Sequence, residues 1–334
     1  MVMMGLDFVG EIPFHDVYIY ATVLTEDGKR MSKSLGTGVD PMDIIESKGA
    51  DALRYTLFSQ TGHNQDIRYS ERRTDEARNF CNKIWNATRF ILMHCGEEAD
   101  APAQLELVDE WILSRLYAAE LATRQALDDY NLQEACSALY RFFWSELCDW
   151  YIEASKSRLE AGEAAPAWTL LQCLSAFLKL LHPLMPHITE DLYQRLPLKT
   201  KAKFLMSSEW PTIPADFLRP ESELTIGRAF EVVRAIRALR AELGIAPMKL
   251  APEVYVDGPI DGVLPLIQSQ AWVEKVISGK PAPDVKALFA TPESADEQII
   301  AGRLRHAPFW RITPRFIRLI DNARGFGNKL ELRL

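Results

Sequence analysis

The 334-residue sequence has no uninterrupted apolar run long enough to cross a membrane. A membrane-spanning helix needs about 18 or more consecutive apolar residues. The most apolar stretch, residues 170–188, is interrupted by a glutamine, a lysine, a histidine and two prolines. The first 14 residues carry two acidic and no basic side chains, which does not fit a signal peptide. We therefore expect a cytoplasmic protein with no membrane partner.

Cysteine is scarce and irregularly spaced. The five cysteines, at positions 81, 95, 136, 148 and 173, are odd in number and form no Cys-x-x-Cys pair. This usage indicates reduced thiols in a reducing compartment, and it argues against a disulfide framework. We also expect no zinc site in this chain.

Basic residues are fewer than acidic ones, 38 against 46, which gives a net charge of −8. As an average, this charge argues against a general binder of polyanions. The distribution is uneven, because residues 303–334 contain eight basic and two acidic side chains, a local +6 that leaves −14 for the first 302 residues. The net charge therefore does not exclude local cationic contacts with a nucleic acid.

The composition and length fit a globular protein of two or three domains of about 100–200 residues each. Residues 1–70 are predicted to be α/β. Residues 14–24 are rich in β-branched and aromatic side chains with little alternation, which favours a strand covered on both faces. A polar loop, residues 29–38, follows it. Asp40 and Pro41 then open a helix as N-cap and first helical residue.

Residues 71–220 are predicted to be helical. Apolar side chains recur there at three- and four-residue steps, which is typical of amphipathic helices. Short connections favour an antiparallel bundle, followed by a proline-containing connector over residues 197–220. The expected helices cover residues 71–95, 108–129, 131–159, 166–182 and 186–196.

Residues 221–334 are predicted to form a smaller, mixed α/β region. A helix is expected over residues 226–243, and a strand over residues 253–256. The remainder has a less regular pattern. The fold class predicted from the sequence is therefore mostly α, with an α/β part at the N-terminus and an α/β tail.

The decapeptide 28–37, Gly-Lys-Arg-Met-Ser-Lys-Ser-Leu-Gly-Thr, combines cations, hydroxyls and two glycines in a loop that follows a predicted strand. Open α/β sheets bind ligands beyond the carboxyl ends of their strands, and a loop at that place can offer ammonium groups and backbone N–H donors to phosphates. Lys33 is the most obvious point charge, and Lys29 and Arg30 could assist it. The alternative is a solvated basic turn.

Within this loop, residues 30–34, Arg-Met-Ser-Lys-Ser, strongly resemble the KMSKS signature of the class I aminoacyl-tRNA synthetases. The flanking residues match as well, with Asp-Gly before the signature and Leu-Gly after it. Among that class the sequence is most similar to the valyl-tRNA synthetases, and the run Cys-Asp-Trp-Tyr-Ile-Glu at 148–153 favours them over the isoleucyl and leucyl enzymes. The resemblance covers about residues 1–250, and its further stretches are residues 65–71, 78–87, 148–156 and 181–190.

The resemblance implies that valine is activated by ATP and then transferred to a valine-accepting tRNA, with ATP as a substrate and Mg²⁺ expected. Residues 1–70 would be the second half of a Rossmann-like catalytic domain. Lys33 would be the catalytic residue that stabilises charge on the leaving pyrophosphate. Arg30 stands where the family usually has its first lysine; the charge is kept, but arginine is a planar fork whereas lysine is a point charge. The implied ATP-binding residues are Lys29, Arg30, Met31, Ser32, Lys33 and Ser34.

Residues 71–220 would be the anticodon-binding domain. Asparagine, arginine and lysine side chains suit the recognition of single-stranded loops, and five of them lie on the polar side of the first bundle helix, although a solvated face would look the same. In the third region, three arginines form one helical stripe that could contact tRNA phosphates or could pair with Glu231 and Glu242. The candidate tRNA contacts are Asn79, Asn82, Lys83, Asn86, Arg89, Arg234, Arg237 and Arg240.

The second signature of the family, His-x-Gly-His, is missing, because none of the six histidines occurs in such a motif. The valine pocket and the editing domain of the family are not represented either, nor is its usual C-terminal coiled coil. We therefore expect a C-terminal portion of the enzyme that is inactive alone and handles valine only with the missing N-terminal portion as its partner. The alternatives are a non-catalytic tRNA-binding module and an isoleucyl or leucyl sibling enzyme.

Overall fold

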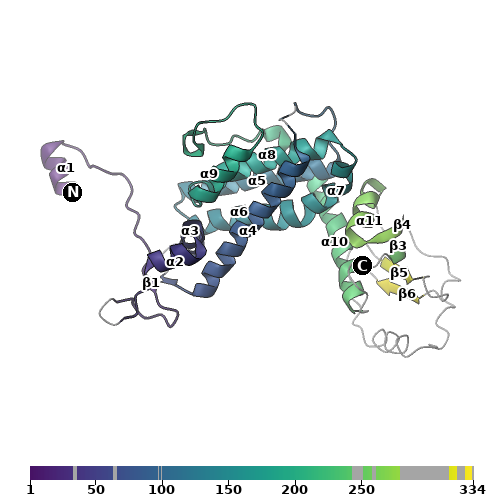
Figure 1. Cartoon of the computed structure of the whole chain (residues 1–334), viewed down its shortest axis with the longest axis horizontal. Coiled ribbons are helices and arrows are strands. Elements are labelled where there is room, and N and C mark those ends of the chain that lie inside the picture. Colours follow the sequence, from purple (N-terminus) through teal and green to yellow (C-terminus); the bar gives the residue numbers. More distant parts are fainter. Residues whose placement is uncertain are drawn as a thin grey trace. The chain divides into compact units, whose positions relative to one another are not determined.

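Helices make up most of the described chain. The computed structural model describes residues 1–32, 36–62, 66–96, 98, 100–242, 251–257, 261–278, 316–321 and 328–332. The helices, which Figure 1 labels, are α1 (Val2–Phe8), α2 (Pro41–Lys48), α3 (Ala50–Phe58), α4 (Glu71–His94), α5 (Leu107–Asp128), α6 (Leu132–Tyr140), α7 (Glu153–Glu160), α8 (Ala164–Leu181), α9 (Pro186–Arg195), α10 (Pro220–Glu242) and α11 (Leu264–Ala271).

The strands are short, and within the described ranges three single-turn 3₁₀ helices interrupt the connecting segments. The strands are β1 (Val23–Leu24), β2 (Ile67–Arg68), β3 (Ala251–Asp257), β4 (Val273–Ser278), β5 (Phe316–Asp321) and β6 (Asn328–Leu332). The 3₁₀ turns are Leu205–Ser207, Ala215–Phe217 and Asp261–Val263.

The helix boundaries confirm the capping signals in the sequence. Helix α2 begins at Pro41, and the Asp40 side chain accepts a hydrogen bond of 2.9 Å from the backbone N–H of Met42. Helix α6 begins after Asn131, whose side chain accepts the N–H of Glu134 at 3.2 Å. A side-chain oxygen at the N-cap satisfies one of the amide donors that the first helical turn leaves unpaired. Local sequence therefore decides where these two helices start.

The single helix predicted over residues 131–159 is wrong in one respect. Between α6 and α7, the segment η1 (Arg141–Ile152) is wound as a π-helix, with hydrogen bonds to the fifth residue along instead of the fourth. Its apolar side chains still point inward, because Phe142, Phe143 and Leu147 are buried. The apolar pattern predicted the buried side of this segment, but it contained no signal for the wider winding.

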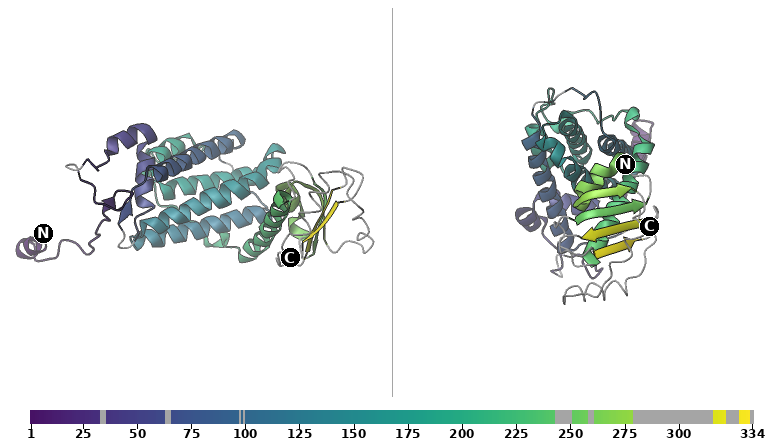
Figure 2. Two further views of the ribbon diagram at one scale, coloured as in Figure 1. Left: turned by 90° about the horizontal axis from the view of Figure 1, so that it is seen from below. Right: turned by 90° about the vertical axis from the view of Figure 1, so that its right-hand side faces the viewer.

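The chain divides into two units, and three helical segments contribute residues to both. The first unit consists of residues 1–101, 115–148 and 167–215. Its core contains Phe143 and Phe177, whose rings stack with their centroids 4.1 Å apart, and Phe80 and Ile84, which have no exposed surface. Helices of this unit lie side by side in both views of Figure 2.

Helix α8 is long and apolar enough to cross a membrane by length and composition alone. In the structure, 61% of this stretch is buried inside the protein, and Leu170, Leu174 and Phe177 have no exposed surface. A helix in the core of a globular protein passes the same length and composition test, because it too must be apolar on most sides. The apolarity of α8 is therefore accounted for by packing within the protein.

The second unit consists of residues 102–114, 149–166 and 216–334, and it contains a four-stranded sheet in the order β4-β3-β5-β6 (Figure 2). Strands β3 and β4 pair in parallel, with Val254 opposite Val276, and α11 lies between them in the chain. Strand β5 pairs antiparallel with both β3 and β6. The strand predicted over residues 253–256 is confirmed within the longer β3.

The buried strand predicted over residues 14–24 is wrong. Only β1 is a strand, and it pairs in parallel with β2 over two residues. Val17, Ile19 and Tyr20 are 70–82% exposed. A strand needs a neighbour for its backbone hydrogen bonds. Ahead of β1, among the described residues, this pairing extends only to Thr22, whose carbonyl accepts the Ile67 N–H at 2.8 Å. The β-branched composition was therefore insufficient to predict a buried strand.

Helix α3 is attached to the loop before α9 by two side chains of opposite charge. The Asp51 carboxylate, 6% exposed, accepts the backbone N–H groups of His187 and Ile188 at 3.3 and 2.6 Å. Arg54 donates to the carbonyls of Pro183 and Leu184 at 2.9 and 3.0 Å. Because Asp51 satisfies amide donors in the first turn of α9, it fixes α3 against α9.

Candidate nucleotide and RNA interface

The basic loop is closed at both ends by local hydrogen bonds. At its start, Thr25 and Lys29 exchange bonds of 2.8–3.1 Å across a turn in which Gly28 has a φ of +79°. Further along, the Ser32 N–H donates to Thr37 Oγ1 at 3.0 Å, and the Thr37 N–H donates to the Ser32 carbonyl at 3.2 Å. Glycine tolerates a positive φ without steric cost, which is why Gly28 suits the first of these turns.

The described side chains of this loop divide into exposed cations and half-buried neighbours. Lys29 and Arg30 are exposed, and the backbone of Arg30 forms an antiparallel bridge with that of Leu24. Met31 and Ser32 are half-buried. The predicted catalytic Lys33, together with Ser34, lies outside the described residues.

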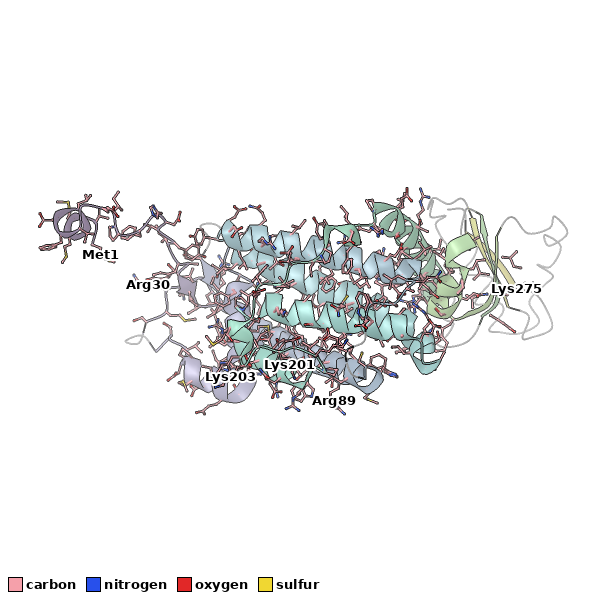
Figure 3. All side chains as sticks on the ribbon, turned by 90° about the horizontal axis from the view of Figure 1, so that it is seen from above. Met1, Arg30, Arg89, Lys201, Lys203 and Lys275 are labelled. Atoms are coloured by element: carbon pink, nitrogen blue, oxygen red, sulfur yellow. The ribbon has the colours of Figure 1, made fainter. Side chains whose placement is uncertain are left out.

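Helix α4 presents its predicted polar face to solvent. Asn79, Asn82, Asn86 and Arg89 are exposed, whereas Phe80, Ile84 and Ile91 on the other side are fully buried. Figure 3 labels Arg89 together with two lysines of the connector, Lys201 and Lys203. The fifth candidate, Lys83, is half-buried, and its ammonium lies 5.2 Å from the centre of the Trp144 ring.

One aromatic residue on this side of α4 was missed by the sequence analysis. Trp85 is 36% exposed, and the Arg195 guanidinium of α9 lies 5.3 Å from the centre of its ring. Trp85 falls three residues after Asn82 and four before Arg89, so helical spacing already places it on the polar face. An exposed tryptophan with a cation over it combines the two kinds of group on which unstacked bases are bound.

The arginine stripe of α10 has contacts that the sequence did not predict. The guanidinium groups of Arg234 and Arg237 lie 5.4 and 5.2 Å from the centre of the Trp150 ring. Arg237 also donates to the carbonyl of Gln270 at 2.8 and 3.1 Å. Burial lowers the pKa of Arg237, and the nearby carboxylates of Glu153 and Asp149 oppose this shift. The third member, Arg240, lies in α10, but its side chain is outside the described part of the structure.

All five cysteines are free thiols. Burial raises the pKa of the Cys81 and Cys136 thiols to about 12 and that of Cys95 to about 11. A thiol is a metal ligand or a nucleophile only as its thiolate, so these three side chains are unreactive near neutral pH. Over the described residues, no three histidine, cysteine, aspartate or glutamate side chains lie close enough to hold a metal ion.

Two family models match the chain. Residues 1–70 match the model of class I tRNA synthetases of the I, L, M and V group, and residues 109–255 match the anticodon-binding domain of tRNA ligases. Helix α4 falls between the two matched ranges. The second match extends beyond the connector into α10 and β3.

Valine–tRNA ligases are similar to the chain over most of its length. The identity is 40% with that of Carboxydothermus hydrogenoformans, over 92% of this chain and 35% of the relative. It is 41% with that of Petrotoga mobilis, over 90% and 36%, and 42% with that of Prochlorococcus marinus, over 90% and 35%. The chain thus spans about a third of the length of these relatives.

Among solved structures, the chain is similar to a LeuRS from Agrobacterium radiobacter K84, whose structure is a ternary complex with tRNA and LeuAMS. The TM-score is 0.52 at 23% sequence identity, and the match covers 65% of this chain and 27% of the other. At this identity the likeness is one of fold.

Proposed function

The chain belongs to the valine–tRNA ligase family of class I aminoacyl-tRNA synthetases, where it matches the C-terminal portion, and we propose that it supplies the signature loop and the tRNA-binding helices of an enzyme that attaches valine to tRNA. The observation that carries this proposal is the continuity of about 40% identity over about 90% of the chain, across both the loop and the helical part.

In this proposal, residues 1–70 are the second half of a Rossmann-like catalytic domain, and the parallel pairing of β1 with β2 supports that arrangement. The helices from α4 to α9 form an antiparallel anticodon-binding bundle. The helical region extends into α10, as the match of residues 109–255 suggests. The division into domains at residues 70 and 220 remains a prediction.

The loop's part in the reaction is electrostatic. Lys33 stabilises the negative charge that grows on the phosphates of ATP as pyrophosphate leaves. Lys29 and Arg30, which are exposed, and the hydroxyl-bearing Ser32 and Ser34 assist by binding the phosphates. Mg²⁺ binds through oxygen ligands and is usually carried on the substrate phosphates. The described side chains of the loop offer cations and the hydroxyls of Ser32 and Thr37 but no carboxylate, so they fit the phosphates and not the metal.

The exposed face of α4 is proposed as the surface that reads a single-stranded loop of tRNA. Asn82 and Asn86 carry both donors and acceptors for base edges, and Arg89 is placed for a phosphate one turn further along. Valine specificity for the tRNA follows from the names of the relatives.

We expect the chain to bind a valine tRNA transcript more tightly than other tRNAs, with an affinity that falls as salt rises. Changing Asn82 and Asn86 to alanine and Arg89 to glutamine together should weaken valine-tRNA binding by at least about tenfold, since each base-edge contact contributes ~1–3 kcal/mol. The measurement is filter binding at several salt concentrations.

The matched control is Lys156→Gln on α7, an exposed cation that is hydrogen-bonded to Glu153 at 2.7 Å. It should leave the affinity within about twofold. If the wild-type chain binds all tRNAs alike, the proposed function fails. If the wild-type chain prefers valine tRNA but the triple variant binds it as tightly as wild type does, the tRNA surface lies elsewhere.

A second candidate function is a non-catalytic tRNA-binding module, which is favoured by the absence of His-x-Gly-His from these 334 residues. Both candidates predict that the chain alone forms no valyl-adenylate. We expect valine-dependent exchange of pyrophosphate into ATP to stay at background, with the enzyme of Carboxydothermus hydrogenoformans as the positive control. Turnover by the isolated chain would show that the residues present suffice for activation.

A further inference from the structure

Residues 16–22, directly ahead of β1, contain a stretch of extended backbone without a partner. In Figure 1 the chain runs between α1 and β1 as a single trace with no strand beside it. Within the described residues, no hydrogen bond joins the backbone of residues 17–21 to another group. The pairing begins at Thr22, whose carbonyl accepts the Ile67 N–H at 2.8 Å. A row of free N–H and C=O groups is a template on which another strand can pair.

The side chains that follow one another here have the composition of a pairing strand. Residues 17–24 read Val-Tyr-Ile-Tyr-Ala-Thr-Val-Leu, a run without charge, proline or glycine. Short segments of high β-propensity and low net charge, with no proline, are those that pair between chains. Exposed strand edges are usually protected by a lysine or a proline, and this run contains neither.

The same side chains are exposed in the single chain. Val17, Ile19 and Tyr20 are 70–82% exposed, and Tyr18 is 46% exposed. The Tyr18 ring lies 5.8 Å from that of Tyr130, in the turn between α5 and α6, which holds the segment at the surface of the first unit. Because the burial of apolar surface is favourable, a second strand at this place would remove both free backbone groups and apolar side chains from water.

We propose that residues 16–22 pair antiparallel with the same residues of a second copy of this chain, with Ile19 opposite Ile19. The unpaired backbone of residues 17–21 is symmetric about Ile19, so this register pairs all of it. Two copies related by a two-fold axis form an interface that closes as a dimer. The inference goes beyond the proposed function, because it concerns self-association and not the binding of tRNA or ATP.

This register gives favourable pairs on both faces. Successive side chains of a strand point to opposite faces, so Tyr18 meets Tyr20 on one face and the two copies of Ile19 meet on the other. Aromatic and β-branched cross-strand pairs stabilise antiparallel strands, whereas like charges opposite each other are destabilising. Asp16, the acidic residue at the start of the segment, lies opposite Thr22. A parallel pair in register would place Asp16 beside Asp16, which favours the antiparallel arrangement.

The neighbouring residues limit the interface to this segment. From Val23 onward, β1 pairs with β2 on one edge, and Leu24 forms an antiparallel bridge with Arg30. At the other end, Pro13 has no backbone N–H to donate to a ladder. The strand pair can therefore extend little beyond residues 16–22 in either direction.

The test measures the mass of the full chain by sedimentation equilibrium over a wide range of protein concentration. We expect a dimer that dissociates on dilution. Ile19→Lys should raise the dissociation constant at least about tenfold, because two like charges then lie opposite each other. The matched control is Ile12→Lys, an exposed isoleucine outside the paired residues, which should leave the dissociation constant within about twofold. Circular dichroism checks that both variants are folded.

Mixed variants identify the second copy as the partner. Ile19→Lys and Ile19→Glu should each be monomeric alone, whereas an equimolar mixture should associate, because opposite charges then face each other. Salt should weaken this association.

A cross-link tests the register. Residues directly opposite each other in an antiparallel pair have Cα atoms about 4.5–5.5 Å apart, a separation that a disulfide can span. Mild oxidation should therefore link two copies of Ile19→Cys, as located by mass spectrometry, and it should not link Ile12→Cys.

Three outcomes would overturn the proposal. A wild-type chain that stays monomeric at every concentration would leave this edge to a different polypeptide, such as another part of a synthetase. A dimer that Ile12→Lys weakens as much as Ile19→Lys would rest on general apolar contact. Charged variants that do not associate when mixed, although wild type dimerises, would show that residue 19 does not face itself.

The proposed function is tested separately by filter binding of valine tRNA to Ile19→Lys. This variant should bind valine tRNA as the wild-type chain does. A chain that dimerises as expected but does not prefer valine tRNA would contradict the proposed function and leave the dimer standing.

Discussion

Replacing Arg158 by methionine is expected to lower the free energy of unfolding by ~3–5 kcal/mol, because it strands a buried carboxylate. Asp109 has no exposed surface and accepts two hydrogen bonds from the Arg158 guanidinium at 2.8 and 2.9 Å. It also accepts the Tyr151 hydroxyl at 2.7 Å and the Glu106 N–H at 3.0 Å. These bonds join the start of α5 to η1 and α7.

The electrostatics of Arg158 are consistent with this role. Burial disfavours the charged guanidinium, but its hydrogen bonds to Asp109 and Glu163 outweigh that cost and raise the pKa of Arg158 above its ordinary value. The arginine therefore stays charged at every pH at which the protein is folded. Removing its side chain removes a full positive charge from beside the buried Asp109.

The control is the double variant Asp109→Asn with Arg158→Met, which has no stranded charge and should be more stable than Arg158→Met alone. Urea unfolding followed by circular dichroism measures both. A deficit below ~1 kcal/mol would contradict this prediction, because the pair would then contribute no more than an exposed ion pair does.

The helices of the central region could be predicted from the sequence because their determinants are local. The period of apolar residues located α4, α5, α8 and α9 to within about two residues, and a single side-chain oxygen fixed the start of α2. The type of helix, in contrast, could not be predicted from the apolar pattern. Within Arg141–Ile152 the buried residues still recur at helix-like steps, so a pattern of burial alone does not distinguish an α-helix from a π-helix.

The strand prediction for residues 14–24 failed because its determinants are not local. A strand is stabilised by its neighbours, and β-propensity reports mainly how a side chain fits a half-buried sheet surface. Val17, Ile19 and Tyr20 have the composition of a buried strand but lie exposed in this structure. Nothing in their own sequence records which strands would flank them.

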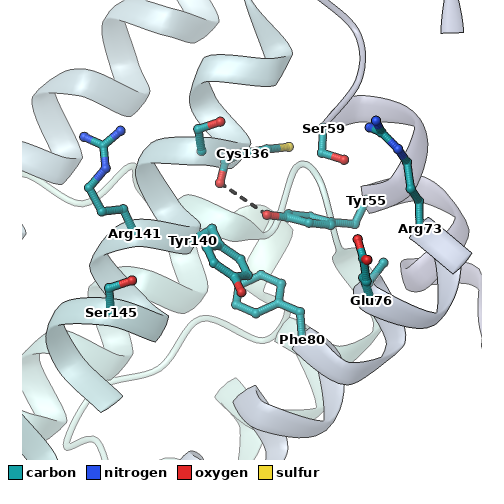
Figure 4. Close-up of a pocket in the computed structure, with 11 residues that line it drawn as sticks. Tyr55, Ser59, Arg73, Glu76, Phe80, Cys136, Tyr140, Arg141 and Ser145 are labelled. Atoms are coloured by element: carbon teal, nitrogen blue, oxygen red, sulfur yellow. Dashed lines mark hydrogen bonds between the residues drawn. The ribbon is translucent and has the colours of Figure 1, made fainter. Parts of the chain in front are cut away.

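The candidate sites differ in the same way. Lys29 and Arg30 could be identified from one decapeptide, because a loop motif is contiguous. The cavity lined by Arg73 and Arg141 could not be predicted from the sequence. These arginines are 68 positions apart in the chain and line one cavity only because α4 packs against α6 and η1 (Figure 4). Tyr140 was not singled out for the same reason. Its ring is contacted by Phe80 of α4 and Trp144 of η1, two helical segments other than its own.

Replacing Trp150 by alanine is expected to cost ~3–5 kcal/mol of stability, the range for removing a large buried aromatic side chain. Trp150 is 8% exposed, and its ring stacks on Phe230 with the centroids 3.9 Å apart. Phe230 in turn packs edge-on against Trp111 at 4.9 Å. Trp150→Phe keeps an aromatic ring in the stack and should lower the stability by less than half as much. Thermal unfolding of the two variants measures both losses. Equal losses would mean that the site relaxes around either side chain.

Trp150 also contacts the arginine stripe of α10, and these contacts predict different roles for its members. If Arg237 served only to bind RNA phosphates, Arg237→Gln would weaken RNA binding and leave stability unchanged. The geometry predicts the reverse, because its guanidinium lies over Trp150 and donates two hydrogen bonds to the Gln270 carbonyl. Arg234→Gln is the matched control. The Arg234 guanidinium also lies over the Trp150 ring, whereas the two hydrogen bonds to the Gln270 carbonyl come from Arg237. We expect Arg237→Gln to lower the unfolding temperature more than Arg234→Gln, and Arg234→Gln to lower RNA affinity more than Arg237→Gln.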